Sequence, residues 1–311
     1  MKTYGFGVDI GGTTVKLGLF RTDGELLDKW EIPTRKENDG SQILPDVAAS
    51  IKEKMTEKGI DPAEVQGIGV GVPGPVTPEG VVRKCVNLGW GVFNVEETLS
   101  GLTGYPVKAA NDANVAALGE MWQGAGKGAT NIVMVTLGTG IGGGVIIGGH
   151  IVAGATGAGG EIGHLPVNDK ETLVCGCGKK GCLEQYASAT GVVTLTKRAL
   201  AASDQPSSLR ELSEVTAKDL FDAAKAGDAL AVNVLEQFGE ILGKGLASIA
   251  CVVNPEMFVI GGGVSKAGTI ITDVVKKYFV PNTFHACREA QFKLAELGND
   301  AGIYGCVKMI L

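Results

Sequence analysis

Hydrophobic positions at the start of the chain predict a run of strands. Apolar residues dominate positions 4–10 and alternate with polar ones over 14–20, and a Gly-Gly turn separates the two runs. A second turn, at Asp23 and Gly24, comes before the apolar-containing run 25–32. Turn residues between such runs are typical of hairpins, so we expect three consecutive strands.

The next segment has the spacing of an amphipathic helix. Its apolar positions fall on one helical stripe. They are Ile43, Val47, Ile51 and Met55. Ser41 is placed to cap the first turn and Gly59 to end the last one, which predicts a helix over residues 41–58.

The remaining pattern alternates between the two kinds of element, which indicates the α/β class. Residues 107–122 read as a strand and then a helix that opens at Asn111 and Asp112. Buried strands that enter glycine turns are predicted over 67–76 and 257–265, and helices over 92–102, 268–278 and most of 187–253.

Residues 131–160 lack Asp, Glu, Lys and Arg and are long enough to imitate a membrane span. Paired glycines make this segment a poor helix, so we interpret it as a buried hairpin with strands near 132–135 and 145–147. The segment 137–149 also repeats the pattern of 9–20, a glycine turn with threonine between two strands.

This repeat and the length of 311 residues predict two domains. We place the boundary near Asn111. The expected domains are residues 1–111 with about 300–311, and residues 112–299, which carry a metal-binding loop.

Composition narrows the possible partners and the compartment. The chain is 44% hydrophobic and 20% charged, with a net charge of −6 and no long basic run. A protein that follows the phosphate backbone of nucleic acids is therefore not expected, and neither is a membrane partner. A glycine turn by residue 11 leaves no apolar signal segment, and seven cysteines without one indicate the reducing cytoplasm.

Three glycine turns are candidates for binding phosphate groups. They are Gly11-Gly12-Thr13-Thr14, Gly138-Thr139-Gly140 and Gly261-Gly262-Gly263. Successive glycine N–H groups can form an anion-binding concavity, and threonine hydroxyls add donors. A tight hairpin without a ligand is the alternative for any single turn, but three such turns in one chain favour phosphate binding. Asp9 ends the strand before the first turn, where it is either an ordinary turn residue or a ligand of Mg²⁺ through water.

Four of the ten cysteine and histidine residues are gathered in one segment. His164, Cys175, Cys177 and Cys182 form a Cys₃His set suited to tetrahedral zinc, with glycines that let the backbone fold tightly. Four protein ligands leave no open position, so such a metal would be structural. The alternative is a reduced loop with incidental cysteines.

These motifs together resemble the ROK (repressor, open reading frame, kinase) family of sugar kinases. They are D-x-G-G-T at Asp9, L-G-T-G-I-G-G-G at 137–144, I-G-G-G-V-S at 260–265, and E-I-G-H followed by C-x-C-G-x-x-G-C-x-E. The resemblance extends from Asp9 to about Ser265, and within the family it is strongest to bacterial ATP-dependent glucokinases. It implies a two-lobed actin-like ATPase fold, similar to ribonuclease H, with an interlobe cleft.

The resemblance also implies an activity and roles for particular residues. The activity is transfer of the ATP γ-phosphoryl group to the 6-hydroxyl of glucose, with Mg²⁺, structural Zn²⁺ and a homodimer. Asp112 matches the catalytic base, although its position in a first helical turn is more often that of a capping residue. Sugar-binding positions are matched by Gly74, Asn87, Asn111, Asp112, Glu161, His164 and Glu184. Asp9 and the first two glycine turns match the phosphate side, and residues 261–263 match the adenosine side.

Other members of the family remain alternatives. Kinases of N-acetylmannosamine or N-acetylglucosamine share the form of the cysteine motif, whereas fructokinases tend to carry a histidine within it, which this chain lacks. Polyphosphate is an alternative phosphoryl donor. A sugar-responsive repressor is disfavoured, because its DNA-binding domain would precede Asp9 and because Asp112 is retained.

Overall fold

The computed structural model describes residues 2–311, which divide into two compact units. The first unit contains the chain up to Thr130 together with Gly144–Gly160 and Glu296–Leu311. The second contains Asn131–Gly143 and Glu161–Ala295. The contacts thus group residues 112–130, 144–160 and 296–299 with the first unit, although the pattern had led us to expect them in the second domain. The reason is that the helix after Asn111 packs against the C-terminal helix.

The first unit is built on a five-stranded sheet with the order β3-β2-β1-β4-β7. The three N-terminal strands are antiparallel neighbours, and β4 and β7 continue the sheet in parallel. The strands are β1 Tyr4–Ile10, β2 Thr14–Arg21, β3 Leu26–Pro33, β4 Val65–Val72 and β7 Val107–Asn111, with a small separate pair β5 Val81–Val82 and β6 Phe93–Asn94. The helices are α1 Glu37–Gly40, α2 Ile43–Lys58, α3 Val95–Thr103, α4 Asp112–Gln123 and α10 Ala301–Lys308.

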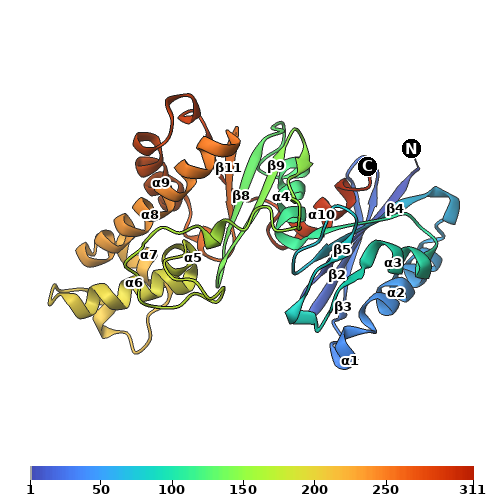
Figure 1. The fold of residues 1–311 in the computed structure, drawn as a ribbon, viewed down its shortest axis with the longest axis horizontal. Coiled ribbons are helices and arrows are strands. Elements are labelled where there is room, and N and C mark those ends of the chain that lie inside the picture. The colour runs from blue at the N-terminus through green and yellow to red at the C-terminus, as the bar shows by residue number, and fades with distance from the viewer. Residues whose placement is uncertain (1) are drawn as a thin grey trace. The chain divides into compact units, whose positions relative to one another are not determined.

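The two faces of this sheet are covered by different helices (Figure 1). Phe6, Val8 and Ile10 of β1 belong to the main hydrophobic cluster, which α2 and α3 complete. Side chains alternate between faces along a strand, so Gly7 and Asp9 point to the other face, where α10 lies. Ser41 does not cap α2, because this helix begins at Ile43 with Gln42 in the N-cap position and without a side-chain cap.

The second sheet repeats the order of the first, as β10-β9-β8-β11-β12. In both sheets the second strand lies between the first and the third, and two parallel strands continue from the first. The strands are β8 Ile132–Leu137, β9 Ile141–Ile147, β10 His150–Ile151, β11 Met257–Gly261 and β12 Gln291–Leu294. The repeated topology agrees with the repeated sequence pattern and with a two-lobed actin-like fold.

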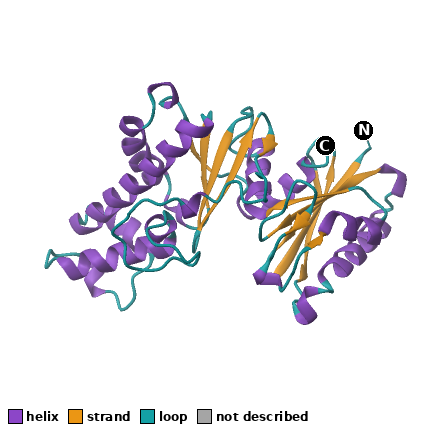
Figure 2. Cartoon of the chain, in the orientation of Figure 1, coloured by secondary structure: helices purple, strands orange, loops and turns teal. Residues whose placement is uncertain are grey.

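Helices of the second unit gather beside β8 and β11 (Figure 2). They are α5 Glu184–Ala187, α6 Ala189–Ala202, α7 Ala217–Lys225, α8 Ala229–Val253 and α9 Thr269–Asn282. The longest, α8, contacts α9, α7, α6 and α5. No helix among residues 2–311 is both long and apolar enough to cross a membrane.

A buried carboxylate in the first unit joins two of the chain segments that connect the units in sequence. Glu120 of α4 is fully buried and accepts hydrogen bonds from the backbone N–H groups of Ala125, Glu296 and Leu297, at 2.9, 3.2 and 2.8 Å. Ala125 lies on the segment that leaves this unit after Thr130, and Glu296 begins the segment that returns. Three donors satisfy a charge that burial would otherwise make costly.

Candidate active site

The predicted site residues fall into two groups, one in each unit. In the first unit, Asn111 caps α4, because its side-chain oxygen accepts from Ala113 N at 3.0 Å and Asn114 N at 3.2 Å. Its amide nitrogen donates to the carbonyl of Gly74 at 3.3 Å and to Asp112 Oδ1 at 2.9 Å. Helix capping and alignment of Asp112 are thus performed by one asparagine.

Asp112 lies in the first turn of α4 and is partly exposed. Its Oδ1 also accepts from the N–H of Ala113 at 2.8 Å. A negative charge is favourable near the positive end of a helix, which gives this carboxylate a structural partner. The first turn of α4 thus holds this carboxylate through a backbone donor and leaves it partly open to solvent.

Gly74 and Asn87 lie on loops that pack together. A β-carbon at Gly74 would approach the carbonyl of Lys84 at 3.1 Å, so the two segments touch through backbone atoms. Asn87 itself lies in a short 3-10 turn, Val86–Leu88, and is exposed. The structure brings Gly74 into contact with Asn111. Asn87 lies on the exposed turn of the neighbouring loop.

The first glycine turn closes directly after Asp9. Gly11 N donates to the carbonyl of Thr14 at 3.0 Å, and a β-carbon at Gly11 would crowd that same oxygen. Gly12 differs, because a β-carbon there would meet nothing within 4 Å. Packing therefore explains the glycine at position 11 but not the one at position 12. The open space beside Gly12 is what close approach of a ligand to the backbone would require. Thr13 is exposed and Thr14 partly so.

Asp9 is a carboxylate short of positive partners. Burial, with the nearby charge of Asp112, raises the pKa of Asp9 from 3.8 to about 6, and Lys16 offsets this only in part. A β-carbon at Gly302 would lie 2.6 Å from Asp9 Oδ2, so α10 encloses this carboxylate closely. A bound cation would relieve the unfavourable charge, and the oxygen donor suits Mg²⁺.

In the second unit, the four predicted metal ligands come together. The ligand atoms of His164, Cys175, Cys177 and Cys182 all lie within 4.8 Å of one another. The sulfur atoms of Cys177 and Cys182 are 3.6 Å apart, and Cys175 Sγ is 3.8 Å from His164 Nδ1. Tetrahedral zinc with Zn–S bonds of about 2.3 Å places its sulfur ligands roughly 3.8 Å apart, so this cluster fits such an ion.

The thiols of the cluster differ in their surroundings. Burial raises the pKa of Cys175 to about 12 and also raises that of Cys182, whereas the N–H of Lys179 lowers the pKa of the exposed Cys177. Without a cation, Cys175 donates its proton to Glu184 Oε1 at 3.0 Å. Metal binding requires the thiolate, so it would remove that donor and leave the Glu184 oxygen available for another one.

Glu184 connects the cluster to the second glycine turn. Its Oε2 accepts from the N–H of Ile141 at 3.3 Å, and a β-carbon at Gly140 would lie 2.7 Å from the same oxygen. His164 presents Nδ1 to the cluster, 3.6 Å from Glu184 Oε1, and Nε2 toward Glu161 at 3.9 Å. The side chain of Glu161 is half exposed. One imidazole thus bridges the cluster and two candidate sugar-binding carboxylates.

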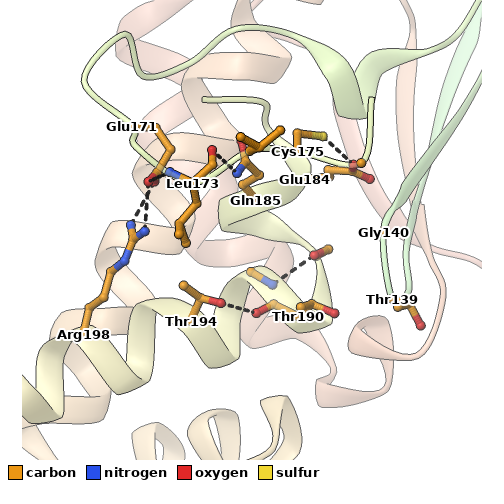
Figure 3. A pocket seen from close by; sticks show the side chains of 14 residues that line it. Thr139, Gly140, Glu171, Leu173, Cys175, Glu184, Gln185, Thr190, Thr194 and Arg198 are labelled. Carbon is orange, nitrogen blue, oxygen red and sulfur yellow. Dashed lines mark hydrogen bonds and ion pairs between the residues drawn. The ribbon is translucent and has the colours of Figure 1, made fainter. Parts of the chain in front are cut away.

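Two cavities of the second unit adjoin the glycine turns. One of about 430 Å³ has Thr139, Gly140, Cys175 and Glu184 in its lining (Figure 3). Another, of about 230 Å³, is lined by Gly263, Val264, Phe221 and other residues of α7 and the 3-10 turn after β11. Gly262 has a φ of +83°, whereas Gly263 has open space around its α-carbon. The second cavity has the apolar walls that an adenine ring needs.

Sequence reasoning missed a polar group at the edge of the larger cavity. Glu171, Tyr186 and Arg198 form a hydrogen-bonded trio there. These three residues are far apart in the sequence and form no recognisable motif. The available signal was an acidic residue only four positions before Cys175.

Two sheets of the same strand order, each with a glycine turn, and a Cys₃His cluster beside two carboxylates are the features of a sugar kinase of the actin-like class. The chain belongs to the ROK family, whose sequence pattern matches residues 5–311. It is 42% identical over 304 residues to the glucokinase of Halalkalibacterium halodurans, covering 96% of this chain and 92% of that protein.

Solved structures of the same family are also similar. The ROK glucokinase of Streptomyces griseus, in complex with glucose and AMPPNP, is 32% identical with a TM-score of 0.74, and 98% of each chain is covered. The ROK hexokinase of Thermus thermophilus is 32% identical with a TM-score of 0.79, covering 99% of this chain and 97% of that one.

The raised pKa of Asp9 predicts a pH-dependent cost to stability. The folded protein holds this proton at higher pH than the unfolded chain, so the free energy of unfolding should fall as pH rises from about 4 to about 6. The shift corresponds to about 3 kcal/mol at most. In chelator, Asp9→Asn should therefore stabilise the protein more at about pH 7.5 than at about pH 4.5, as measured by urea unfolding.

Asp204→Asn is the control, since Asp204 is an exposed loop aspartate. Its effect should not change between the two pH values. Equal effects of Asp9→Asn at both would refute the raised pKa.

Proposed function

We propose that this protein is a glucokinase that transfers the γ-phosphoryl group of ATP to the 6-hydroxyl of glucose. The observation that carries this proposal is the similarity to glucokinases over nearly the whole chain. The placement of Asp112, Glu184 and the glycine turns supports it. A glucose 6-hydroxyl is a weak nucleophile, and each of these groups supplies something that its phosphorylation needs.

Asp112 would act as the general base. Its carboxylate would accept the proton of the 6-hydroxyl as that oxygen bonds to the γ-phosphorus and the bond to the β,γ-bridging oxygen breaks. Asn111 would hold Asp112 Oδ1 through one amide hydrogen and would donate the other to a sugar hydroxyl in place of the Gly74 carbonyl. Glu161, His164 and Glu184 would bind other sugar hydroxyls, which orients the reacting one.

The glycine turns would bind the nucleotide. Backbone N–H groups of Gly12, Thr139 and Gly140 would contact phosphate oxygens, whereas that of Gly138 closes the turn by donating to the carbonyl of Gly140 at 3.0 Å. The cavity beside Gly263 would take the adenosine part. Asp9 would hold Mg²⁺ through water, and the ion would supply charge neutralisation on the phosphates. Neutralisation of Asp9 by a cation would also offset the cost of burying this carboxylate.

The Cys₃His cluster would hold structural Zn²⁺. It would fix the loop that carries Glu161, His164 and Glu184, because a glycine-rich ribbon lacks side chains that could hold them by packing. A homodimer and a cytoplasmic location remain predictions.

The substrate proposal is tested by comparing sugars and phosphoryl donors. With ATP and Mg²⁺, ADP release coupled to a reporter enzyme should be fastest with glucose among glucose, mannose, fructose, N-acetylmannosamine and N-acetylglucosamine. Polyphosphate should be a poor donor, since the cavity beside Gly263 suits a nucleoside. Faster turnover of an N-acetylhexosamine would overturn the choice of glucose but not the kinase class.

Asp112→Asn tests the general base. Turnover should fall by about 10²–10⁴-fold, because the amide cannot accept the proton. Glucose affinity should be retained, since the amide oxygen can still accept from Ala113 N. Initial rates and glucose titration by intrinsic fluorescence measure the two effects, and near-normal turnover would remove Asp112 from this role.

Cys177→Ala tests the structural metal. Cys177 is exposed, so its loss should release the ion without disturbing the core, and glucose affinity should weaken far more than nucleotide affinity. Elemental analysis counts zinc, and Cys251→Ala is the control because Cys251 is also exposed but outside the cluster. Absence of zinc from reduced, chelator-free protein would refute the metal, and equal weakening of both ligands would refute its role at the sugar.

A further inference from the structure

Glu171 is a buried carboxylate within a loop that is otherwise largely exposed. Only 4% of its side chain is exposed, and it accepts five hydrogen bonds. Two come from Arg198 at 2.9 and 3.0 Å, one from the hydroxyl of Tyr186 at 2.5 Å, and two from the N–H groups of Thr172 and Leu173 at 2.8 and 3.0 Å. Figure 3 shows the paired contact with Arg198 at the edge of the larger cavity. The Arg198 guanidinium holds the pKa of Glu171 well below its usual range.

These contacts join three segments of the second unit. Glu171 belongs to the cluster loop, defined here as residues 165–183, Tyr186 to α5 and Arg198 to α6. The Tyr186 hydroxyl also accepts from Asn168 Nδ2 at 2.9 Å. Gln185 adds a parallel link, since its amide donates to the carbonyl of Leu173 at 3.0 Å.

Packing alone does not hold this part of the loop. Leu173 and Val174 are 52% and 64% exposed, so they contribute little apolar burial. Backbone pairing joins Pro166 to Cys182 and Val174 to Lys180. The segment between Asn168 and Leu173 is held mainly by side-chain contacts, of which Glu171 makes the most. A bidentate carboxylate–guanidinium pair is directional, so it defines position as well as adding stability.

Glu184 lies on the short helix that this arrangement contacts. The one-turn helix α5 begins at Glu184, and Tyr186 lies two residues further along it. Glu184 contacts the cluster through Cys175 and the glycine turn through Ile141 N. A helix of four residues has little stability of its own, so its orientation comes from such contacts together with the packing of its buried residues against α6 and α8.

We propose that Glu171, Arg198 and Tyr186 form a clamp of positioning residues that holds the cluster loop on α5 and α6 and so sets Glu184 for sugar binding. This role rests on the proposed function. The clamp contacts the part of the cluster loop before Cys175, whereas the three cysteines of the cluster lie in the part from Cys175 to Cys182. The two devices therefore hold adjoining parts of one loop, and Cys175 lies where the two parts meet.

The test compares Glu171→Gln with a matched variant elsewhere in the same unit. Glu236 accepts from Lys277 and the hydroxyl of Tyr278, both at 2.7 Å, which is a similar but more exposed carboxylate–cation–tyrosine contact between α8 and α9. Glu171→Gln should raise the glucose KM about tenfold and change kcat and the ATP KM by less than about threefold, because binding and not the chemical step is weakened. Glu236→Gln should lower the thermal midpoint and leave all three constants unchanged.

Hydrogen exchange and metal retention give readouts that do not depend on turnover. In Glu171→Gln, amide exchange in peptides covering residues 168–175 and 184–187 should accelerate, and zinc should pass to a chelating dye faster than from the wild type. Arg198→Lys keeps the charge and loses the paired contact, so it should show the same effects. Tyr186→Phe removes one of the five hydrogen bonds and should have a smaller effect.

Each outcome decides the proposal. Unchanged glucose KM with unchanged exchange in Glu171→Gln would overturn the clamp, and so would an equal rise of the glucose and ATP KM, which would indicate general destabilisation. If Glu171→Gln does not fold, Arg198→Lys and Tyr186→Phe decide by the same criteria. If the wild type does not phosphorylate glucose, the proposed function fails, and exchange in residues 184–187 alone decides the clamp.

Discussion

The direct contact of the C-terminal helix with backbone atoms is the constraint on which the first unit depends. A β-carbon at Gly7 or Gly69 would overlap carbonyl groups of α10, and one at Gly119 would overlap the carbonyl of Ala301. Glycine at these places lets β1, β4 and α4 approach the helix without intervening side chains. Asp9 is thereby enclosed beside Gly302, so the last segment of the chain sets the environment of a residue near its beginning.

In the second unit, polar contacts constrain the segment that carries Glu184. Glu184 receives contacts from the cluster through Cys175 and from the glycine turn through Ile141, and the trio around Glu171 anchors its helix. An exposed, glycine-rich loop buries too little apolar surface to be ordered by packing. A buried ion pair supplies directional restraint instead, and the Cys₃His cluster would add to it on binding a metal. Such a loop can present carboxylates to a sugar while remaining open to solvent.

Several features could be predicted from local sequence patterns, because interactions between residues close together in the chain decide them. The hairpin at residues 132–147 follows from two apolar runs around a glycine turn, and the ligand set follows from cysteine spacing. Ser41 shows the limit of such reasoning. A serine before an amphipathic run is a common cap, yet the chain turns at Asn38 and Asp39, both with positive φ, and the helix starts two residues after Ser41.

By itself, the sequence determined the α/β class, the repeated hairpins and the family, and it supplied the candidate site residues, since periodicity and motif spacing are properties of neighbouring residues. Only the tertiary structure decided which unit α4 joins, which ring nitrogen of His164 faces the cluster, and that Glu171 meets Arg198. Each of these depends on segments distant in the chain coming to lie side by side. The physical reason is that burial and charge pairing act through space, so a carboxylate in a loop reveals its partner only once the helix carrying that partner has packed.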